Sequence, residues 1–437
     1  MSKYTEVPRS AQIGSLARKF ESLSRKFASQ EYNAGMNPEG RGYAMPHYER
    51  EIVSTIASRM NEPRRFMQIV MGPRQTGKST AIWQALAHAD IPRIVEEVTF
   101  RGESPDWVRA HWQRARNLIQ GDQKRAVLVL DEIQYVSNWS SVVKELWDED
   151  ARAGIDLRVV LSGSSATLIQ NGLSESLAGR FELIHCPHWT YRECREAFGY
   201  SLDEFLYFGG YPGTSSFIGD EPRWYSYMNG SIIDPAIAND VIGLADVRNP
   251  ALMRRLFYLG APYSAQEVAY RKILGQLDDK GNTSTIAHYL DLLSDAGLLC
   301  GLQKYDPKLV RQKASSPRLA VYDTGLMTAT YGHKRKTLLT DPSARGHLVE
   351  SAVGAYLLNR SKSEGFDVNW WREGNHEVDF VVSFGGETLA IEVKSGRVKK
   401  TGGIVEFMNR FPHARAMVVG SAATNLEDFL SGDVPLF

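Results

Sequence analysis

The chain has 437 residues, of which 43% are hydrophobic and 23% are charged, and its formal net charge is +0. A chain of this length predicts roughly two to four domains, and the composition is ordinary for a globular protein with hydrophobic cores. The balanced charge excludes an overall electrostatic field for nucleic acid, so nucleic-acid binding would need local basic patches.

No apolar run reaches the roughly eighteen residues of a membrane span, so we expect no membrane-spanning helix and no membrane partner. The three cysteines, Cys186, Cys194 and Cys300, lack the spacing of metal ligands. Free thiols in a reducing cytosol are the simplest interpretation of these cysteines, so we expect a cytoplasmic protein.

Residues 1–47 predict an N-terminal helical arm followed by a linker. Apolar residues recur at spacings of three and four between Ile13 and Phe27, as in an amphipathic helix. The arm superficially resembles a targeting helix, but Glu21 and the absence of a cleavage context argue against that interpretation. We expect this helix to dock on the body of the protein or on a second subunit.

The segment from Gly72 to Ser79 matches the phosphate-binding pattern G-x-x-x-x-G-K-[ST]. It follows an apolar run from Phe66 to Met71 that predicts a buried strand, and it precedes a predicted helix from Thr80 to Ala89. This strand–loop–helix setting is the one in which the pattern binds a nucleoside triphosphate. The candidate nucleotide-binding residues of this segment are Gly72, Pro73, Arg74, Gln75, Thr76, Gly77, Lys78, Ser79 and Thr80.

The residue types in this loop suit the binding of phosphate. Glycine lets the backbone wrap closely around an anion, so that successive N–H groups and the helix N-terminus converge on the phosphates. Lys78 is expected to reach the β- and γ-phosphates, and the Ser79 hydroxyl is expected to ligate Mg²⁺. We expect ATP as the nucleotide, because the chain has no separate guanine-reading motif.

A second motif ends the apolar run from Ala126 to Leu130, which predicts a strand covered on both faces. Asp131 and Glu132 follow this run, at the strand end where ligands bind in open α/β sheets. Asp131 is the candidate acid that holds Mg²⁺ through water. Glu132 is the candidate catalytic base that polarises the attacking water.

Small polar residues follow a third predicted strand, from Leu157 to Leu161. One of them, Ser164, is a candidate contact for the γ-phosphate or for the attacking water, with a plain turn as the alternative interpretation. Further along the chain, Arg180 is a candidate arginine finger or sensor of developing charge on the phosphate. A structural ion-pair partner is the alternative role for Arg180.

Alternating strands and helices predict a doubly wound α/β domain with a parallel sheet over residues 48–198, which we interpret as an AAA-type P-loop ATPase domain. Residues 199–248 predict a small helical lid that follows this domain. The remaining elements expected in the ATPase domain are strands at residues 93–100 and 181–186 and helices at residues 106–120 and 139–151.

Residues 249–342 predict a winged-helix-like segment. A capping-box pattern at Ser264 opens a predicted helix that runs to about Leu277, and a second predicted helix from Thr283 to Leu293 precedes an apolar strand. Such modules often bind DNA through the second helix, but this helix is not basic, so a structural or protein-contact role is the alternative. The basic residues nearby would contact a phosphate backbone or only solvate loops: Lys304, Lys308, Arg311, Lys313, His333, Lys334, Arg335, Lys336, Arg397, Lys399 and Lys400.

Two predicted strands near the C-terminus, at residues 377–382 and 388–394, form a predicted hairpin. Side chains alternate across a strand, so Glu392 and Lys394 project from one face, and Asp379 can reach that face from the neighbouring strand. Glu350 lies on the preceding helix and could point toward the same place.

Three carboxylates and a lysine at one site have a known chemical use. The acids hold one or two divalent metals that clamp a phosphodiester, and the lysine orients water or stabilises charge. The arrangement of Glu350, Asp379, Glu392 and Lys394 resembles the restriction-endonuclease-like fold, so residues 343–437 predict a nuclease-like α/β domain. All four are catalytic candidates, and the three acids are also candidate metal ligands. The alternative is a domain that keeps this fold but only binds a protein or nucleic acid.

From about Tyr48 onward, the chain resembles a large bacterial and archaeal family of predicted ATPases that have an AAA-type module and a C-terminal domain of unknown function. The resemblance implies ATP binding, a winged-helix segment and a nuclease-like C-terminal domain, but no biological role. The segments that carry it are residues 72–79, 130–134, 161–165, 177–180, 209–212, 322–326, 377–380 and 391–394.

Two functional hypotheses follow from the sequence. The first is an ATP-hydrolysing AAA-type enzyme that acts on DNA and carries a metal-dependent nuclease domain. The second is an ATP-dependent switch whose C-terminal domain binds a protein or nucleic acid without cleaving it. AAA modules often work as rings, so a homo-oligomer or a protein partner is compatible with both hypotheses.

Overall fold

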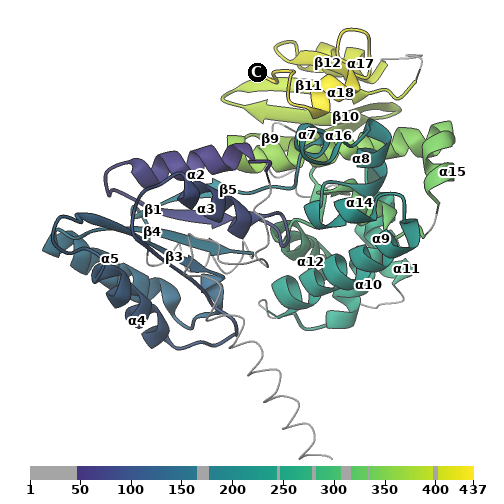
Figure 1. The fold of residues 1–437 in the computed structure, drawn as a ribbon. Coiled ribbons are helices and arrows are strands. Elements are labelled where there is room, and N and C mark those ends of the chain that lie inside the picture. The colour runs from purple at the N-terminus through teal and green to yellow at the C-terminus, as the bar shows by residue number, and fades with distance from the viewer. Residues whose placement is uncertain are drawn as a thin grey trace, which may run out of the picture. The chain divides into compact units, whose positions relative to one another are not determined.

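The computed structural model describes residues 47–164, 177–243, 247–277, 282–306, 316–332, 334–396 and 402–437. The predicted N-terminal helix lies outside these residues. Figure 1 shows the described elements coloured in chain order, from the first strands and helices in purple and blue to the C-terminal sheet, which runs from green at residues 367–373 to yellow near the C-terminus.

A five-stranded parallel sheet forms the first part, with the strand order β2-β3-β4-β1-β5. Its strands are β1 (Met67–Met71), β2 (Arg93–Glu97), β3 (Arg125–Asp131), β4 (Asp156–Gly163) and β5 (Phe181–His185). In the described part of this domain, the α-helices that accompany these strands are α2 (Glu51–Asn61), α3 (Lys78–Ala87), α4 (Pro105–Arg116) and α5 (Trp139–Ala153). The predicted parallel α/β domain is therefore confirmed.

The sheet is covered on both faces, as its continuous apolar strands predict (Figure 1). Side chains alternate along β3, so Leu128 packs with α4 and α5 in one core, while Val127 and Val129 pack with α2 and α3 in another. Because the strands are parallel, their carboxyl ends meet at one edge of the sheet, where the loop after β1 and the acids at the end of β3 come together.

The middle of the chain is largely helical and carries a small three-stranded antiparallel sheet, β6-β8-β7. Its strands are β6 (Gln266–Glu267), β7 (Leu299–Leu302) and β8 (Arg318–Val321). The α-helices are α7 (Tyr191–Phe198), α8 (Leu202–Phe208), α9 (Glu221–Tyr227), α10 (Pro250–Gly260), α11 (Tyr270–Gln276), α12 (Thr283–Asp295), α14 (Thr324–Thr328) and α15 (Arg335–Thr340). Other helical turns are the 3₁₀ segments η2 (Pro212–Phe217) and η5 (Ala261–Tyr263) and the π-helical segments η3 (Met228–Ile233) and η4 (Ala236–Ile242).

One prediction in this region is wrong. The helix expected to begin at Ser264 begins at Tyr270 instead, and residues 266–267 form β6. The Ala265 N–H donates to the carbonyl oxygen of Leu319 at 2.7 Å, so this segment pairs with β8 and leaves no capping box at Ser264. Pairing with a strand distant in sequence overrides the local capping pattern.

The C-terminal part is a four-stranded sheet with the order β12-β11-β10-β9, shown at the top of Figure 1. The predicted hairpin is confirmed, because β10 and β11 pair antiparallel with Phe380 opposite Ile391. The strands are β9 (Asp367–Glu373), β10 (His376–Phe384), β11 (Glu387–Val393) and β12 (Arg415–Val419), and the helices are α16 (Pro342–Glu364), α17 (Gly402–Arg410) and α18 (Leu426–Leu430).

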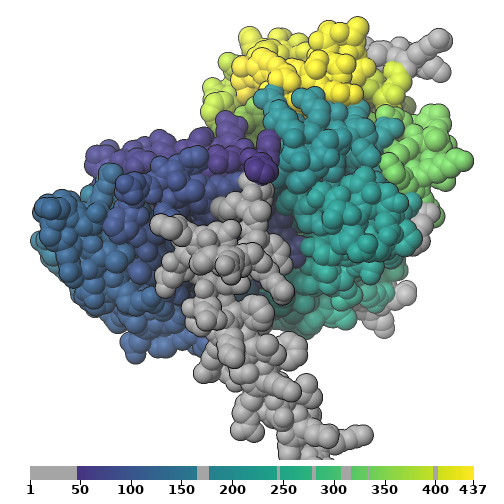
Figure 2. All heavy atoms as spheres, viewed as in Figure 1, coloured from purple at the N-terminus to yellow at the C-terminus, as the bar shows by residue number. Residues whose placement is uncertain are grey.

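The C-terminal sheet and the helical middle share one hydrophobic core, which contains buried side chains from Tyr191 to Leu436. Figure 2 shows the yellow C-terminal segment packed directly on the teal helical segment. At the junction of their two sheets, the Tyr305 N–H donates to the Trp370 carbonyl oxygen at 2.6 Å. Backbone pairing and a common core therefore join these two parts.

Candidate functional site

The loop after β1 has the backbone that phosphate binding requires. Gly77 adopts a φ of 91° at the N-cap of α3, and Gln75 also lies in the left-handed region with a φ of 61°. A side chain at Gly72 would place its Cβ only 2.0 Å from the carbonyl oxygen of Cys186, at the end of the adjacent strand β5. These positions need glycine or a strained backbone because the loop packs tightly against the sheet.

Lys78 is buried, with 6% of its surface exposed, and its ammonium group turns back onto the loop. Its Nζ donates to the carbonyl oxygens of Gly72 and Pro73 at 3.0 and 2.8 Å. These contacts hold a positive charge within the curve of the loop. Contact between Lys78 and the phosphates of a nucleotide stays a prediction.

Ser79 and Asp131 meet at the carboxyl edge of the sheet. The Ser79 hydroxyl donates to Asp131 Oδ2 at 2.6 Å, and the hydroxyl of Ser162, near the end of β4, donates to Asp131 Oδ1 at 2.6 Å. Hydroxyl and carboxylate oxygens side by side are the hard donors that Mg²⁺ prefers, so these residues fit the ion that the sequence predicts. Ser79 and Asp131 would hold the ion, which supplies charge neutralisation on the phosphates when it is bound.

Glu132 lies next to Asp131 with an uncommon backbone conformation, a φ of 54°. Its Oε2 accepts hydrogen bonds from Gln134 and, at 3.2 Å, from the Ser164 hydroxyl. Burial raises the pKa of the Glu132 carboxyl, while the nearby Lys78 ammonium acts in the opposite direction. The geometry therefore fixes a partly desolvated carboxylate beside the candidate magnesium ligands, a suitable environment for a base.

Asp240, in the π-helical segment η4, connects this site to the helical middle of the chain. Its side chain is 2% exposed and forms a two-pronged salt bridge with Arg74, in which Nε and Nη2 each lie 3.0 Å from a carboxylate oxygen. The Ser164 hydroxyl lies 3.2 Å from the same carboxylate. Arg74 and Ser164 thus contact both the nucleotide-binding edge and a helix far away in the sequence. Nothing in the local sequence around Asp240 signals this role.

The backbone of the loop after β1 is bound at Thr76 by residues that the sequence did not indicate. The carbonyl oxygen of Thr76 accepts hydrogen bonds from Arg50 Nη1 at 3.1 Å and from Trp189 Nε1 at 2.9 Å. Arg50 is buried and pairs with Glu193, which also completes the capping box of α7. The loop therefore rests on side chains from before β1 and after β5.

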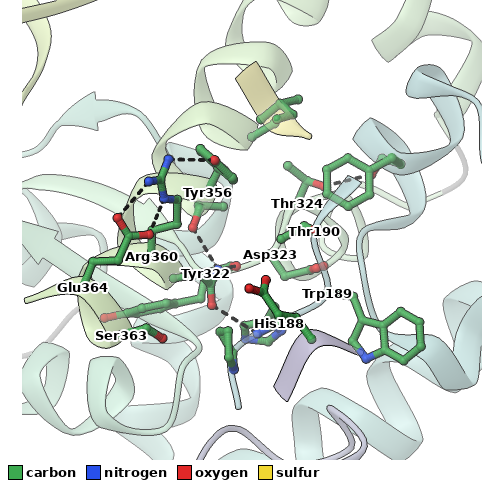
Figure 3. Close-up of a pocket in the computed structure, with 17 residues that line it drawn as sticks. His188, Trp189, Thr190, Tyr322, Asp323, Thr324, Tyr356, Arg360, Ser363 and Glu364 are labelled. Carbon is green, nitrogen blue, oxygen red and sulfur yellow. Dashed lines mark hydrogen bonds and ion pairs between the residues drawn. The ribbon is translucent and has the colours of Figure 1, made fainter. Parts of the chain in front are cut away.

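Trp189 also lines a cavity of about 200 Å³, together with His188, Asp323 and Arg360 (Figure 3). Asp323 caps α14, and its carboxylate accepts hydrogen bonds from the N–H groups of Gly210 at 2.6 Å and Gly325 at 2.8 Å. Burial raises the pKa of Asp323 to about 6. The polar groups of Asp323 are thus engaged in joining α8 to α14.

Arg180 lies away from the loop on its own chain. Arg180 directly precedes β5, and its carbonyl oxygen accepts a hydrogen bond from the N–H of Met67, the first residue of β1. It therefore lies at the amino ends of the parallel strands, opposite the carboxyl ends where the loop after β1 lies. Its guanidinium forms a two-pronged salt bridge with Asp148, with distances of 2.8 and 3.0 Å. This geometry matches the structural ion-pair alternative within one chain.

The structure brings the predicted C-terminal acids together. Asp379 on β10 accepts a hydrogen bond from the Val393 N–H at 2.7 Å, and Lys394 pairs with Glu392. Burial raises the pKa of both Asp379 and Glu392, and the negative charge of Asp379 adds to the effect on Glu392. One Glu392 oxygen is buried without a hydrogen-bond partner.

Two further residues complete this cluster, and the sequence did not indicate either of them. Arg318, the first residue of β8, forms ion pairs with Glu350 on α16 and with Glu377 on β10, and it lies 3.6 Å from Asp379. A guanidinium only donates hydrogen bonds and stays charged, so it competes with a metal for these oxygens. In the described ranges, no three acids, histidines or cysteines are arranged as a metal site. These residues therefore do not fit the metal that the sequence predicts for Glu350, Asp379 and Glu392.

The first part of the chain thus has the fold of a P-loop ATPase domain. Residues 64–195 match the family described as an AAA domain. Residues 199–337 and 345–430 match two domains of unknown function, DUF8612 and DUF4143. The chain carries an AAA-type ATPase domain followed by these two C-terminal domains.

Proteins of similar sequence occur in several microorganisms. An uncharacterized protein of Haemophilus influenzae is 25% identical over 348 residues, which cover 75% of this chain and 82% of that protein. An uncharacterized protein of Mycobacterium tuberculosis is 27% identical over 336 residues, which cover 75% of this chain and 69% of that protein.

Solved structures resemble the chain more weakly. A Walker-type ATPase of Pyrococcus abyssi has a TM-score of 0.47 and 14% identity, and the match covers 68% of this chain and 99% of that chain. The RuvB Holliday junction branch migration motor of Thermotoga maritima has a TM-score of 0.31 and 15% identity, and the match covers 57% of this chain and 86% of that chain.

Among the described residues, no helix combines the length and apolar character that a membrane crossing requires.

Proposed function

We propose that the protein is a magnesium-dependent ATPase whose nucleotide state is transmitted to the helical middle of the chain through Asp240. Lys78 binds the phosphates, Ser79 and Asp131 hold the ion, and Glu132 accepts the proton of the attacking water. The observation that carries this proposal is the convergence of Ser79, Asp131 and Glu132 at the carboxyl edge of the sheet, beside the loop that holds Lys78.

The first test removes the positive charge within the loop. Replacing Lys78 by alanine should weaken ATP binding by a factor of about 100 or more, because a charged hydrogen bond to phosphate is lost inside a partly desolvated loop. Equilibrium binding of a fluorescent ATP analogue measures the change. Lys124→Ala is a matched control, since Lys124 lies on an exposed turn and donates to the carbonyl oxygen of Gly121. Unchanged ATP-analogue binding by Lys78→Ala would show that the nucleotide does not bind at this loop.

The route from the nucleotide to the rest of the chain starts at Arg74. Arg74 belongs to the loop itself, and its guanidinium is held by Asp240 and by the Tyr135 hydroxyl at 3.0 Å. A bound polyphosphate brings negative charge to the same loop and competes with Asp240 for this guanidinium. The Ser164 hydroxyl contacts both Glu132 and Asp240, so the candidate catalytic base and Arg74 are each connected to η4 through Asp240.

Replacing Asp240 by asparagine should uncouple η4 from the nucleotide. We expect ATP to change hydrogen exchange of residues 228–243 in the wild type, and we expect the variant to exchange faster and equally with or without ATP, because its salt bridge is gone. Asp234→Asn is the control, since half-buried Asp234 lies between η3 and η4 and pairs with Arg254 and the Tyr258 hydroxyl. The switch proposal fails if ATP changes the exchange of these residues by the same amount in the wild type and in Asp240→Asn.

DNA remains a candidate partner in this proposal, as the sequence indicates. Most of the basic residues on which that hypothesis depends, such as Arg311, Lys313 and Lys399, lie outside the described residues. An arginine-finger role for Arg180 would require a second copy of the chain, because Arg180 lies at the edge of the sheet away from its own loop. We propose the switch rather than the nuclease, since the C-terminal acids are engaged by Arg318.

A further inference from the structure

The carboxylate cluster of the C-terminal domain is occupied by an arginine from another part of the chain. Arg318 opens β8, and its side chain is only 3% exposed. One guanidinium nitrogen pairs with Glu350, and the same nitrogen lies 3.6 Å from Asp379. The other terminal nitrogen pairs with Glu377. The guanidinium thus lies among acids that come from α16 and β10.

Much of the negative charge in this cluster is compensated without a metal. Arg318 pairs with Glu350 and Glu377 and lies near Asp379, Lys394 pairs with Glu392, and Arg372 is shared between Glu377 and Glu267. A divalent ion would have to displace a buried guanidinium and leave it without its partners, which is strongly unfavourable. The cluster therefore already contains the positive charge that a metal would otherwise supply.

Backbone pairing at the same junction fixes the position of Arg318. Arg318 pairs with Leu302 across β8 and β7, and the chain that follows β7 pairs with β9 of the C-terminal sheet at Lys304 and Trp370. The Trp370 N–H also donates to the carbonyl oxygen of Gln303 at 3.2 Å. The guanidinium is therefore delivered to the acids by a strand joined to the C-terminal sheet, and not by a free loop.

We propose that the Arg318 guanidinium takes the place of the divalent cation and clamps the three-stranded sheet to the C-terminal sheet. The cluster of Arg318 with Glu350, Glu377 and Asp379 is then an internal ion-pair joint that is closed to metal. This inference concerns the C-terminal domain and is independent of ATP hydrolysis at Lys78 and Glu132.

The wild-type protein provides the first test. Nucleotide-free protein is titrated with Mn²⁺ by isothermal calorimetry, and the result is compared with the same titration of Asp379→Asn. We expect the two titrations to agree, because Asp379 holds no ion in the wild type. An additional Mn²⁺ site in the wild type that disappears in Asp379→Asn would overturn the proposal.

The second test removes the guanidinium. Arg318→Met leaves the acids uncompensated, so we expect its melting temperature to fall and Mn²⁺ to restore part of the loss, with Mn²⁺ binding at least about tenfold tighter than in the wild type. Adding Asp379→Asn should abolish this gain. Arg318→Lys keeps a positive charge and should gain no Mn²⁺ site. Equal Mn²⁺ binding by the wild type and a folded Arg318→Met would contradict the proposal. If Arg318→Met does not fold, the comparison of the wild type with Asp379→Asn still tests the proposal.

Discussion

Replacing Glu132 by glutamine should stop ATP turnover while ATP binding survives. Glutamine keeps the size of the side chain and can still contact Ser164 and Gln134, but it cannot accept a proton from water. General-base catalysis typically contributes a factor of about 10² to 10⁴, so we expect a loss of that size in the rate of phosphate release. A fluorescent ATP analogue should bind the variant with nearly unchanged affinity.

The pH dependence of the wild type gives a further check on Glu132. Burial raises the pKa of this carboxyl, and a base must be deprotonated, so turnover should fall with decreasing pH already above the ordinary range of a glutamate. Glu96→Gln is a matched control, because Glu96 lies on neighbouring β2 and pairs with exposed Arg114. If Glu132→Gln hydrolyses ATP at the wild-type rate, the catalytic base lies elsewhere.

Replacing Gly72 by alanine should damage both the loop and the sheet. The new Cβ would lie 2.0 Å from the carbonyl oxygen of Cys186, which is backbone and cannot rotate away. The Cys186 N–H donates to the Met71 carbonyl oxygen at 2.7 Å, so relief of the clash would separate the ends of β1 and β5. Forced overpacking of this kind costs about 3 kcal/mol, and we also expect ATP binding to be lost.

Urea unfolding and ATP-analogue binding of Gly72→Ala measure the two effects. Gly230→Ala is the control, since a Cβ at Gly230 meets no atom within 4 Å. We expect Gly230→Ala to unfold at nearly the wild-type urea concentration. A Gly72→Ala variant that matches the wild type in both measurements would show that the loop does not pack as described.

The geometry of the candidate nucleotide site could be predicted because its signals are local in the sequence. The loop from Gly72 to Ser79 and the acids at the end of β3 lie at the ends of apolar strands, and parallel pairing brings those ends together. Asp240 and Arg318 could not be predicted, because each acts through contacts with residues far away in the sequence. An arginine at the start of an apolar strand, as in the run Arg318 to Val321, is the only sequence signal that marks the joint.

The dependence on contacts distant in sequence also explains the wrong helix prediction at Ser264 and the wrong choice of cation for the C-terminal acids. A capping pattern describes what the local chain prefers, but β6 pairs with β8 instead. The alternation of β10 and β11 correctly indicated that Asp379 and Glu392 come together. It gave no information about which cation lies among them, because Arg318 comes from outside the C-terminal domain.

The most direct measurement is phosphate release from ATP by purified wild type in Mg²⁺, repeated after chelation of the metal and with Lys78→Ala. We predict steady phosphate release in Mg²⁺ that stops on chelation, because the ion that Ser79 and Asp131 would hold is needed to neutralise the charge of the phosphates. Lys78→Ala should release no phosphate above background. Release that continues without divalent metal, or at the wild-type rate in Lys78→Ala, would contradict the assignment of ATP hydrolysis to this site.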